Sequence, residues 1–186
     1  MRKTIFLCLI IVINVLYTVK VYADTIITYN FSINVYDVSL IRINPSTTFS
    51  LNLLSSQAGG SMSSVPNNST YLQLTSIPPE NVTRKIMAKI QSSTNSNGVP
   101  PGTKLTLHAE KISGYGDVGI PAPEIKLSLS SNELLIDNIA SGYTGSSSGQ
   151  GFILYYTLQV DPATYSQLRS TQTISTVVVY TISNNP

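Results

Sequence analysis

The sequence predicts an all-β fold, a single antiparallel β-sandwich domain of immunoglobulin-like or jelly-roll type. Three observations support this class. Apolar and polar residues alternate with a period of two in most segments that follow Ala23, as half-buried strands require. The connections between these segments are rich in Gly, Pro, Ser and Asn, which favour turns. No long helical periodicity is present, and only residues 162–169 suit a short helical turn.

The chain begins with the features of a secretory signal peptide. Arg2 and Lys3 provide a positive start, an apolar run extends from Ile5 to Leu16, and Ala23 completes a small-residue cleavage pattern. The alternative is an N-terminal membrane anchor. The apolar run is shorter than the roughly 20 residues that span a bilayer, so a cleaved signal is the interpretation we favour.

We therefore expect a signal peptide at 1–23 and a β-sandwich domain at 24–186, secreted into the periplasm or displayed on a bacterial cell surface. The full chain has 11 basic and 9 acidic residues. Cleavage would remove three of the basic residues and leave eight against nine, a net charge of −1. Cleavage would also remove Cys8, the only cysteine. Without disulfides the domain must rely on its core, which is feasible because a domain of about 150 residues buries roughly 70% of its unfolded surface.

The first predicted strand lies directly after the expected cleavage site. Ile27, Tyr29, Phe31, Ile33 and Val35 are apolar, and the residues between them are polar. This segment could be an edge strand of its own domain that ends in a bulge. It could equally be an assembly strand that completes the sheet of a neighbouring molecule, with main-chain hydrogen bonds for affinity and alternate side chains for fit. Both interpretations stay open.

The other predicted strands follow in order along the chain. A change of phase after Val35 separates the first strand from the next, and Asn44-Pro45 ends that second segment. The last segment includes TVVVY at 176–180, an aggregation hazard unless it pairs within the sheet. No repeat or long linker divides the chain, so one domain is expected. The predicted segments are 38–43, 49–53, 71–74, 86–90, 105–109, 125–129, 134–139, 152–160 and 174–182.

Composition excludes two classes of protein. Charged residues make up 11% of the chain, against a usual share of about 25%, while hydrophobic residues reach 42%. Disordered chains show the reverse balance. Nucleic-acid-binding domains carry a basic patch or stripe, whereas the formal charge here is only +2 and is spread along the chain. We expect no nucleic-acid partner.

Two glycine motifs match catalytic or nucleotide-binding patterns in their residues but not in their predicted structural context. Residues 145–149 read G-x-S-x-G, but a strand rather than a helix is predicted to follow, and His108, the only histidine, lies upstream. Residues 114–119 read G-x-G-x-x-G, but Ile120-Pro121 follows where a dinucleotide-binding site needs a helix. We interpret both as loops and expect neither a catalytic residue nor an enzymatic activity.

The sequence signals for a metal site or an acid–base pair are equally weak. One histidine and no cysteine after cleavage exclude the usual zinc sites, and no EF-hand calcium loop is present. A calcium site assembled from distant loops stays open. His108 and Glu110 share a strand face, where a surface pair is more common than a catalytic one. We expect no metal and no cofactor.

Two tyrosines and an aspartate are the candidate ligand-binding residues. The chain has 11 tyrosines and no tryptophan. Tyr115, Asp117 and Tyr143 lie in predicted loops and could form a shallow site for a glycan or another ligand. The alternative is that tyrosine simply suits half-buried strand surfaces.

Several short segments resemble a group of small secreted β-sandwich proteins of Bacteroidota. The resemblance implies a secreted sandwich and, by looser analogy with spore-coat-U-like and other pilin subunits, a role in surface fibres. The expected absence of cysteine departs from many such subunits. The similar segments are 38–43 (VSLIRI), 83–86 (TRKI), 99–103 (VPPGT), 139–145 (IASGYTG) and 176–182 (TVVVYTI).

Export, the lack of catalytic groups and the N-terminal alternation together favour a non-enzymatic surface protein. We expect a pilus- or fimbria-type subunit or adhesin that assembles through its N-terminal strand. Its partners would be copies of itself or related subunits, with a periplasmic chaperone and an outer-membrane usher, and host or matrix glycans for an adhesin. The alternative is a secreted carbohydrate- or ligand-binding β-sandwich module. A secreted hydrolase is the third hypothesis.

Overall fold

Strands dominate the computed structural model, which describes residues 31–185 without 56, 94–97 and 171–172. The chain divides into two compact units, Met1–Val35 and Tyr36–Pro186. All elements described below belong to the second unit. They are β1 (Val38–Asn44), β2 (Asn67–Ile77), β3 (Arg84–Ser93), β4 (Thr103–Lys111), β5 (Tyr115–Gly116), β6 (Ile120–Pro121), β7 (Ile125–Leu127), β8 (Glu133–Ile139), β9 (Gly142–Tyr143), β10 (Phe152–Val160), the 3₁₀ helix η1 (Pro162–Gln167) and β11 (Thr176–Asn184).

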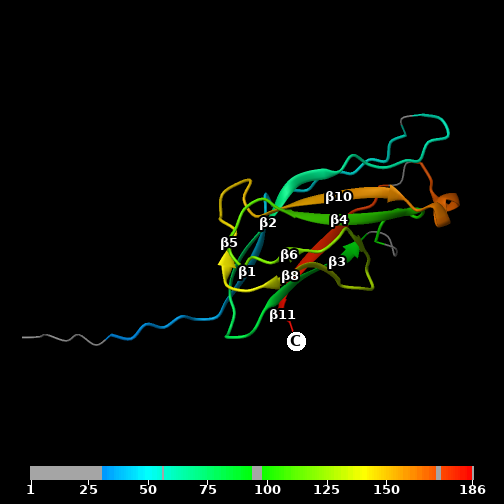
Figure 1. Cartoon of the computed structure of the whole chain (residues 1–186). Coiled ribbons are helices and arrows are strands. Elements are labelled where there is room, and N and C mark those ends of the chain that lie inside the picture. Colours follow the sequence, from blue (N-terminus) through cyan, green and yellow to red (C-terminus); the bar gives the residue numbers. More distant parts are fainter. Residues whose placement is uncertain (1–30, 56, 94–97, 171–172, 186) are drawn as a thin grey trace, which may run out of the picture. The chain divides into compact units, whose positions relative to one another are not determined.

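These strands form two antiparallel sheets that pack as a β-sandwich (Figure 1). The larger sheet has seven strands in the order β5-β9-β2-β10-β4-β7, and β1 pairs with the other side of β2. The smaller sheet has four strands in the order β11-β3-β8-β6. The predicted all-β antiparallel sandwich is thus confirmed.

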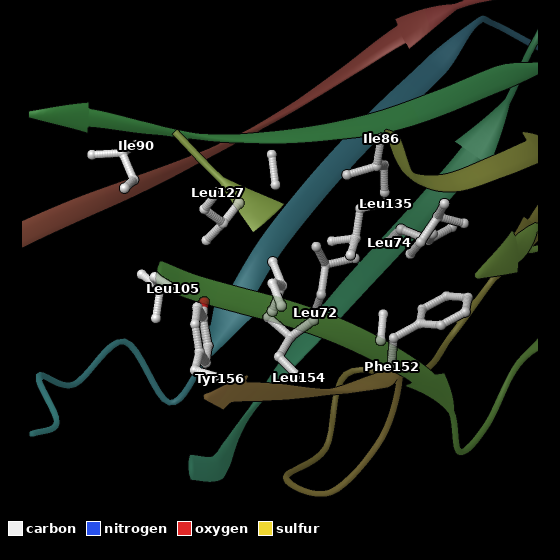
Figure 2. Packing of buried hydrophobic residues seen from close by; sticks show 14 of the residues in the cluster. Leu72, Leu74, Ile86, Ile90, Leu105, Leu127, Leu135, Phe152, Leu154 and Tyr156 are labelled. Atoms are coloured by element: carbon white, nitrogen blue, oxygen red, sulfur yellow. The ribbon is translucent and has the colours of Figure 1, made fainter. Parts of the chain in front are cut away.

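Alternating side chains from both sheets fill the space between them. On β10, Leu154 and Tyr156 are buried, while Tyr155 between them is only partly buried. Ile86 and Ile90 of β3 face them from the smaller sheet (Figure 2). Figure 2 shows side chains from the two sheets meeting in one apolar layer. The residues Phe152, Leu72, Leu107 and Leu135 are fully buried.

One predicted strand is wrong. Residues 49–53 form no strand, although Leu51 packs against the core and the ring of Phe49 lies 4.9 Å from that of Tyr156. An extended segment can direct alternate side chains inward without a partner for its backbone, so alternation alone cannot distinguish it from a strand. The 125–129 segment is also shorter than predicted, because pairing with β4 ends at Leu127.

The two sheets are linked by a pair of tyrosine hydroxyls in the core. Tyr156 of β10 and Tyr180 of β11 hydrogen-bond to each other through their hydroxyl groups. Burial raises the pKa of Tyr180 well above its usual value near 10, and the charge and hydrogen bond of Tyr156 add to this. Burial also raises the pKa of Tyr156, although its bond to Tyr180 opposes the shift. Both hydroxyls are therefore held in the neutral form.

Replacing one of these tyrosines by phenylalanine removes the partner of the other buried hydroxyl. We expect Tyr156→Phe or Tyr180→Phe to lower the free energy of unfolding by about 1–2 kcal/mol. The double variant should lose less unfolding free energy than the sum of the losses of the two single variants, because it leaves no buried hydroxyl without a partner. Urea unfolding followed by circular dichroism measures all three. Strictly additive losses would contradict the pairing.

The same pair gives the stability a dependence on alkaline pH. The unfolded chain releases these protons near pH 10, whereas the folded chain holds them to higher pH. The stabilisation is therefore complete below pH 10 and is lost as the pH rises above 10 towards the folded pKa values. The double phenylalanine variant should show a shallower alkaline loss of unfolding free energy than the parent chain, measured by urea titrations across this range.

Candidate functional site

The predicted assembly strand lies largely at the limit of the described residues. Ile27 and Tyr29 lie outside them. Phe31, Ile33 and Val35 are described, belong to no strand, and expose 80%, 77% and 74% of their surface. The assembly role of this segment stays a prediction, and for its last five residues the structure records no pairing within the chain's own described sheets.

A buried arginine holds the first residues of the sandwich, Asp37 and Val38, in place. Arg84, at the start of β3, is only 2% exposed. Its guanidinium forms an ion pair with Asp37 and donates to the carbonyl of Val38, at the beginning of β1. It also donates to Ser76 Oγ of β2 at 3.1 Å and to Asn184 Oδ1 of β11 at 3.2 Å. One side chain thus joins the first residues of the sandwich to both sheets.

Sequence reasoning did not select Arg84, although a signal was present. Arg84 has the same strand parity as Ile86, Ala88 and Ile90, the inward-facing residues of β3. A charged residue in the apolar phase of a strand is rarely fully buried unless it is paired. The pattern therefore could have indicated an internal ion pair, but the partner Asp37 lies 47 residues away and no local rule connects the two.

The sandwich has two long sheet edges among its described strands. β1, with seven residues, pairs only with β2, and β11, with nine residues, pairs only with β3. The other edge strands β5, β6 and β7 have two or three residues each. Natural sheets usually protect long edges with charge, proline or a covering segment. β11 contains neither a charged residue nor a proline, so it is the least protected edge.

The structure brings together two of the three predicted ligand-binding residues. Tyr115 and Tyr143 are directly opposite on β5 and β9, and their rings stack with centroids 5.1 Å apart. They expose 64% and 50% of their surface. Asp117 is also exposed and belongs to no strand. Its backbone forms hydrogen bonds with the backbones of Ser141 and Ala140. A ligand role for these residues stays a prediction.

The G-x-G-x-x-G motif forms a tightly packed loop beside these rings. A Cβ atom on Gly116 would lie 2.3 Å from the carbonyl oxygen of Ser141, and one on Gly119 would lie 2.6 Å from the Ile139 side chain. Val118, inside the motif, is fully buried. No helix follows, since the chain continues into β6. The glycines therefore serve close packing, in agreement with the loop interpretation.

The second glycine motif is a loop held by two polar side chains. Gln73 of β2, only slightly exposed, donates to the carbonyls of Ser147 at 2.7 Å and Gln150 at 3.1 Å. Arg42 of β1 donates to Gln73 Oε1 at 2.6 Å and to the carbonyl of Ser146. β10 follows this loop, where a nucleophile elbow would require a helix.

His108 lies on the outer face of the larger sheet. Its ring stacks on that of Tyr155 with centroids 6.1 Å apart, and the Tyr155 hydroxyl donates to Glu110 Oε2 at 3.1 Å. That hydrogen bond is the main reason why the pKa of Tyr155 is raised. Glu110 is thus engaged with tyrosine, and no described contact joins it to the imidazole.

Two further features are absent from the described residues. No group of three or more His, Cys, Asp or Glu side chains is arranged to hold a metal ion there. Within the same residues, no helix has the length and apolar character needed to cross a membrane.

These features define the described part of the chain as an antiparallel β-sandwich with two long strands at its sheet edges, an arginine that anchors its first strand, and an exposed tyrosine pair. No protein-family model matches it, nor does any curated protein or solved structure. A functional proposal therefore depends on the residues of the chain itself.

Proposed function

We propose that this protein is an exported, non-enzymatic structural subunit of a bacterial cell surface that assembles with copies of itself through residues 27–35. The observation that carries the proposal is the exposure of Phe31, Ile33 and Val35. Three large apolar side chains in alternating positions, each more than two-thirds exposed, are costly to leave in water. A partner surface that buries them would remove this cost.

The sandwich offers surfaces suited to such a segment. An extended chain can add to a free sheet edge, where its backbone forms hydrogen bonds and its alternate side chains pack against the sheet. The start of β1 and the end of β11 lie close together just after the segment in sequence, because Arg84 contacts both Val38 and Asn184. An assembly strand and an acceptor edge on one molecule allow head-to-tail association of many copies.

The proposal is tested by deleting residues 24–35 while retaining Tyr36 and Asp37. Retaining Asp37 preserves the ion pair with Arg84, so the sandwich should keep its β-type circular dichroism spectrum. We expect the parent chain to form concentration-dependent assemblies in analytical ultracentrifugation and the deletion variant to stay monomeric.

A matched control replaces Phe31, Ile33 and Val35 together by serine without shortening the chain. It should assemble as poorly as the deletion variant if the apolar side chains provide the contact. Equal assembly of the parent, the deletion and the serine variant would refute the proposal. An unfolded deletion variant alongside a folded serine variant that assembles normally would do the same.

The stacked tyrosines favour a second candidate function, the binding of a glycan. Sugar rings present apolar faces that pack on exposed aromatic rings, and tyrosine combines such a face with a polar hydroxyl. Tyr115 and Tyr143 form a ready-made aromatic surface with Asp117 nearby in sequence as an acceptor. This function is compatible with an adhesive subunit or with an independent carbohydrate-binding module.

A glycan array screened with the parent chain and with Tyr143→Ala tests this second function. We expect binding that the substitution abolishes while the circular dichroism spectrum is unchanged, because Tyr143 is half exposed. Tyr165→Ala is the matched control, since Tyr165 is similarly exposed but lies in η1. Binding that survives Tyr143→Ala, or no binding at all, would exclude the tyrosine pair as a glycan site.

A further inference from the structure

We infer that the acceptor for the N-terminal segment is the free edge of β11 in a second copy of the chain, and that the two strands pair antiparallel. This inference rests on the proposed function and specifies the surface that receives the segment. It is carried by the composition of β11, the match between the two strands and the position of Asp37.

β11 is the better acceptor of the two long edges. The shorter strand β1 carries Arg42, whose guanidinium is already bound to Gln73 and to the carbonyl of Ser146. β11 is two residues longer and has neither charge nor proline along its whole length. An incoming strand therefore meets no charge to desolvate and no break in the row of backbone groups. Val177, on its outer face, is 49% exposed.

The core-facing side of β11 is incompletely covered. Val178, Tyr180 and Ile182 pack against the core cluster but stay only partly buried. They recur every second residue, as do the apolar residues of the segment 27–35. A strand placed beside β11 would set its own apolar side chains next to these three and remove more of their surface from water.

Lengths and charges also match. The segment 27–35 and β11 each have nine residues, and neither contains a charged side chain. Antiparallel pairing over the full length sets Phe31 opposite Tyr180 and Ile33 opposite Val178, so that apolar residues share the inner face. The same register sets Asn34 opposite the exposed Val177 on the outer face. A shift by one residue would reverse both faces, which fixes the register to steps of two.

The position of Asp37 favours a second copy over the chain's own segment. Arg84 binds both Asp37 and Asn184, so Asp37 lies at the C-terminal end of β11. A segment that folded back along its own β11 from this point would run parallel to it. Every strand pair among the described residues is antiparallel. A second copy can present the segment in the antiparallel direction without this constraint.

Engineered disulfides between two copies test the inference. All variants are full-length chains with Cys8→Ser, which removes the only native thiol. One tagged copy carries Asn34→Cys and a second, differently tagged copy carries Val177→Cys. After mixing and mild oxidation, we expect a disulfide-linked dimer that contains both tags. A single chain with both substitutions should give a ladder of covalent multimers.

Two matched controls use exposed positions elsewhere. Lys126→Cys lies on β7 of the larger sheet, and Ser39→Cys lies on β1, the competing edge. Asn34→Cys should cross-link to Val177→Cys several-fold more than to either control. Preferential linkage to Ser39→Cys, or linkage no stronger than to Lys126→Cys while the parent chain still assembles, would overturn the β11 assignment and leave the assembly function standing.

Two further outcomes separate the inference from the proposed function. If the doubly substituted chain forms only an internal disulfide at every concentration, residues 34 and 177 meet within one chain, and the inference is overturned. If the parent chain shows no assembly by ultracentrifugation, the proposed function itself fails. The covalent ladder, together with assembly of the parent chain, supports both.

Discussion

Replacing Arg84 by alanine is expected to lower the free energy of unfolding by about 2–4 kcal/mol, because a buried cation that donates hydrogen bonds to several groups is lost. The guanidinium has four partners: the Asp37 carboxylate, the Val38 carbonyl, Ser76 Oγ and Asn184 Oδ1. Alanine leaves all four without this donor and creates a space beside them. A domain of ordinary stability has about 5–15 kcal/mol in total, so the loss is large.

The loss should be concentrated where β1 begins. Asp37 and Val38 are held to the sandwich by Arg84, and Ser76 is the partner of Ser39 in the β1–β2 register. Hydrogen exchange measured by mass spectrometry should therefore rise in β1 before it rises in β10. Urea unfolding followed by circular dichroism gives the overall loss; the chain has no tryptophan to report it by fluorescence.

Two conservative variants separate the contributions of charge and of geometry. Arg84→Lys keeps the charge but cannot reproduce the planar fork that reaches four acceptors, so we expect a loss smaller than that of Arg84→Ala but still measurable. Asp37→Asn keeps an acceptor oxygen and removes the negative charge. The Asp37 side chain is 53% exposed, so solvent compensates part of the change and the loss should be the smallest of the three. A negligible effect of Arg84→Ala would contradict the anchoring role.

Strand periodicity predicted most of the sandwich because it reports which side chains face a core. The 152–160 segment became β10 with Leu154 and Tyr156 facing inward, as its alternation indicated. Periodicity could not reveal β5, β6 and β9, since two-residue strands have no period. It also predicted a strand at residues 49–53, where side chains pack inward but the backbone has no strand partner. Pairing between strands depends on distant residues and leaves no local pattern.

The candidate sites were predictable to different degrees. The chain's exposed apolar segment and its tyrosines could be named from residue type and spacing, but the stack of Tyr115 on Tyr143 required the pairing of β5 with β9. The anchoring of Asp37 by Arg84 depends on a contact between residues far apart in the chain. The edge position of β11 likewise follows from the sheet order. The sequence TVVVY would suit a central strand as well as an edge strand, so sequence alone could not predict it.

The second large effect concerns the glycine motif beside the tyrosine pair. We expect Gly116→Ala to lower the free energy of unfolding by about 2–4 kcal/mol through left-handed backbone strain and overpacking together. The φ angle of Gly116 is +72°, which L side chains rarely adopt. Its added Cβ would also lie 2.3 Å from the carbonyl oxygen of Ser141 and 3.1 Å from Cα of Gly142. These are backbone atoms of the neighbouring turn and strand, so no side-chain rotation relieves the clash.

Gly149→Ala is the matched control, because it separates backbone strain from the clash. Its φ angle of +78° is nearly the same, but nothing lies within 4 Å of the added Cβ. It should cost only the strain of the left-handed conformation, about 1 kcal/mol. The difference between the two variants in urea unfolding therefore measures the close approach of β5 and β9. If both variants lose the same stability, the packing role assigned to this glycine is wrong. If only Gly116→Ala also weakens the near-ultraviolet signal of the stacked tyrosines, then the motif that resembles a nucleotide-binding loop serves to hold Tyr115 against Tyr143.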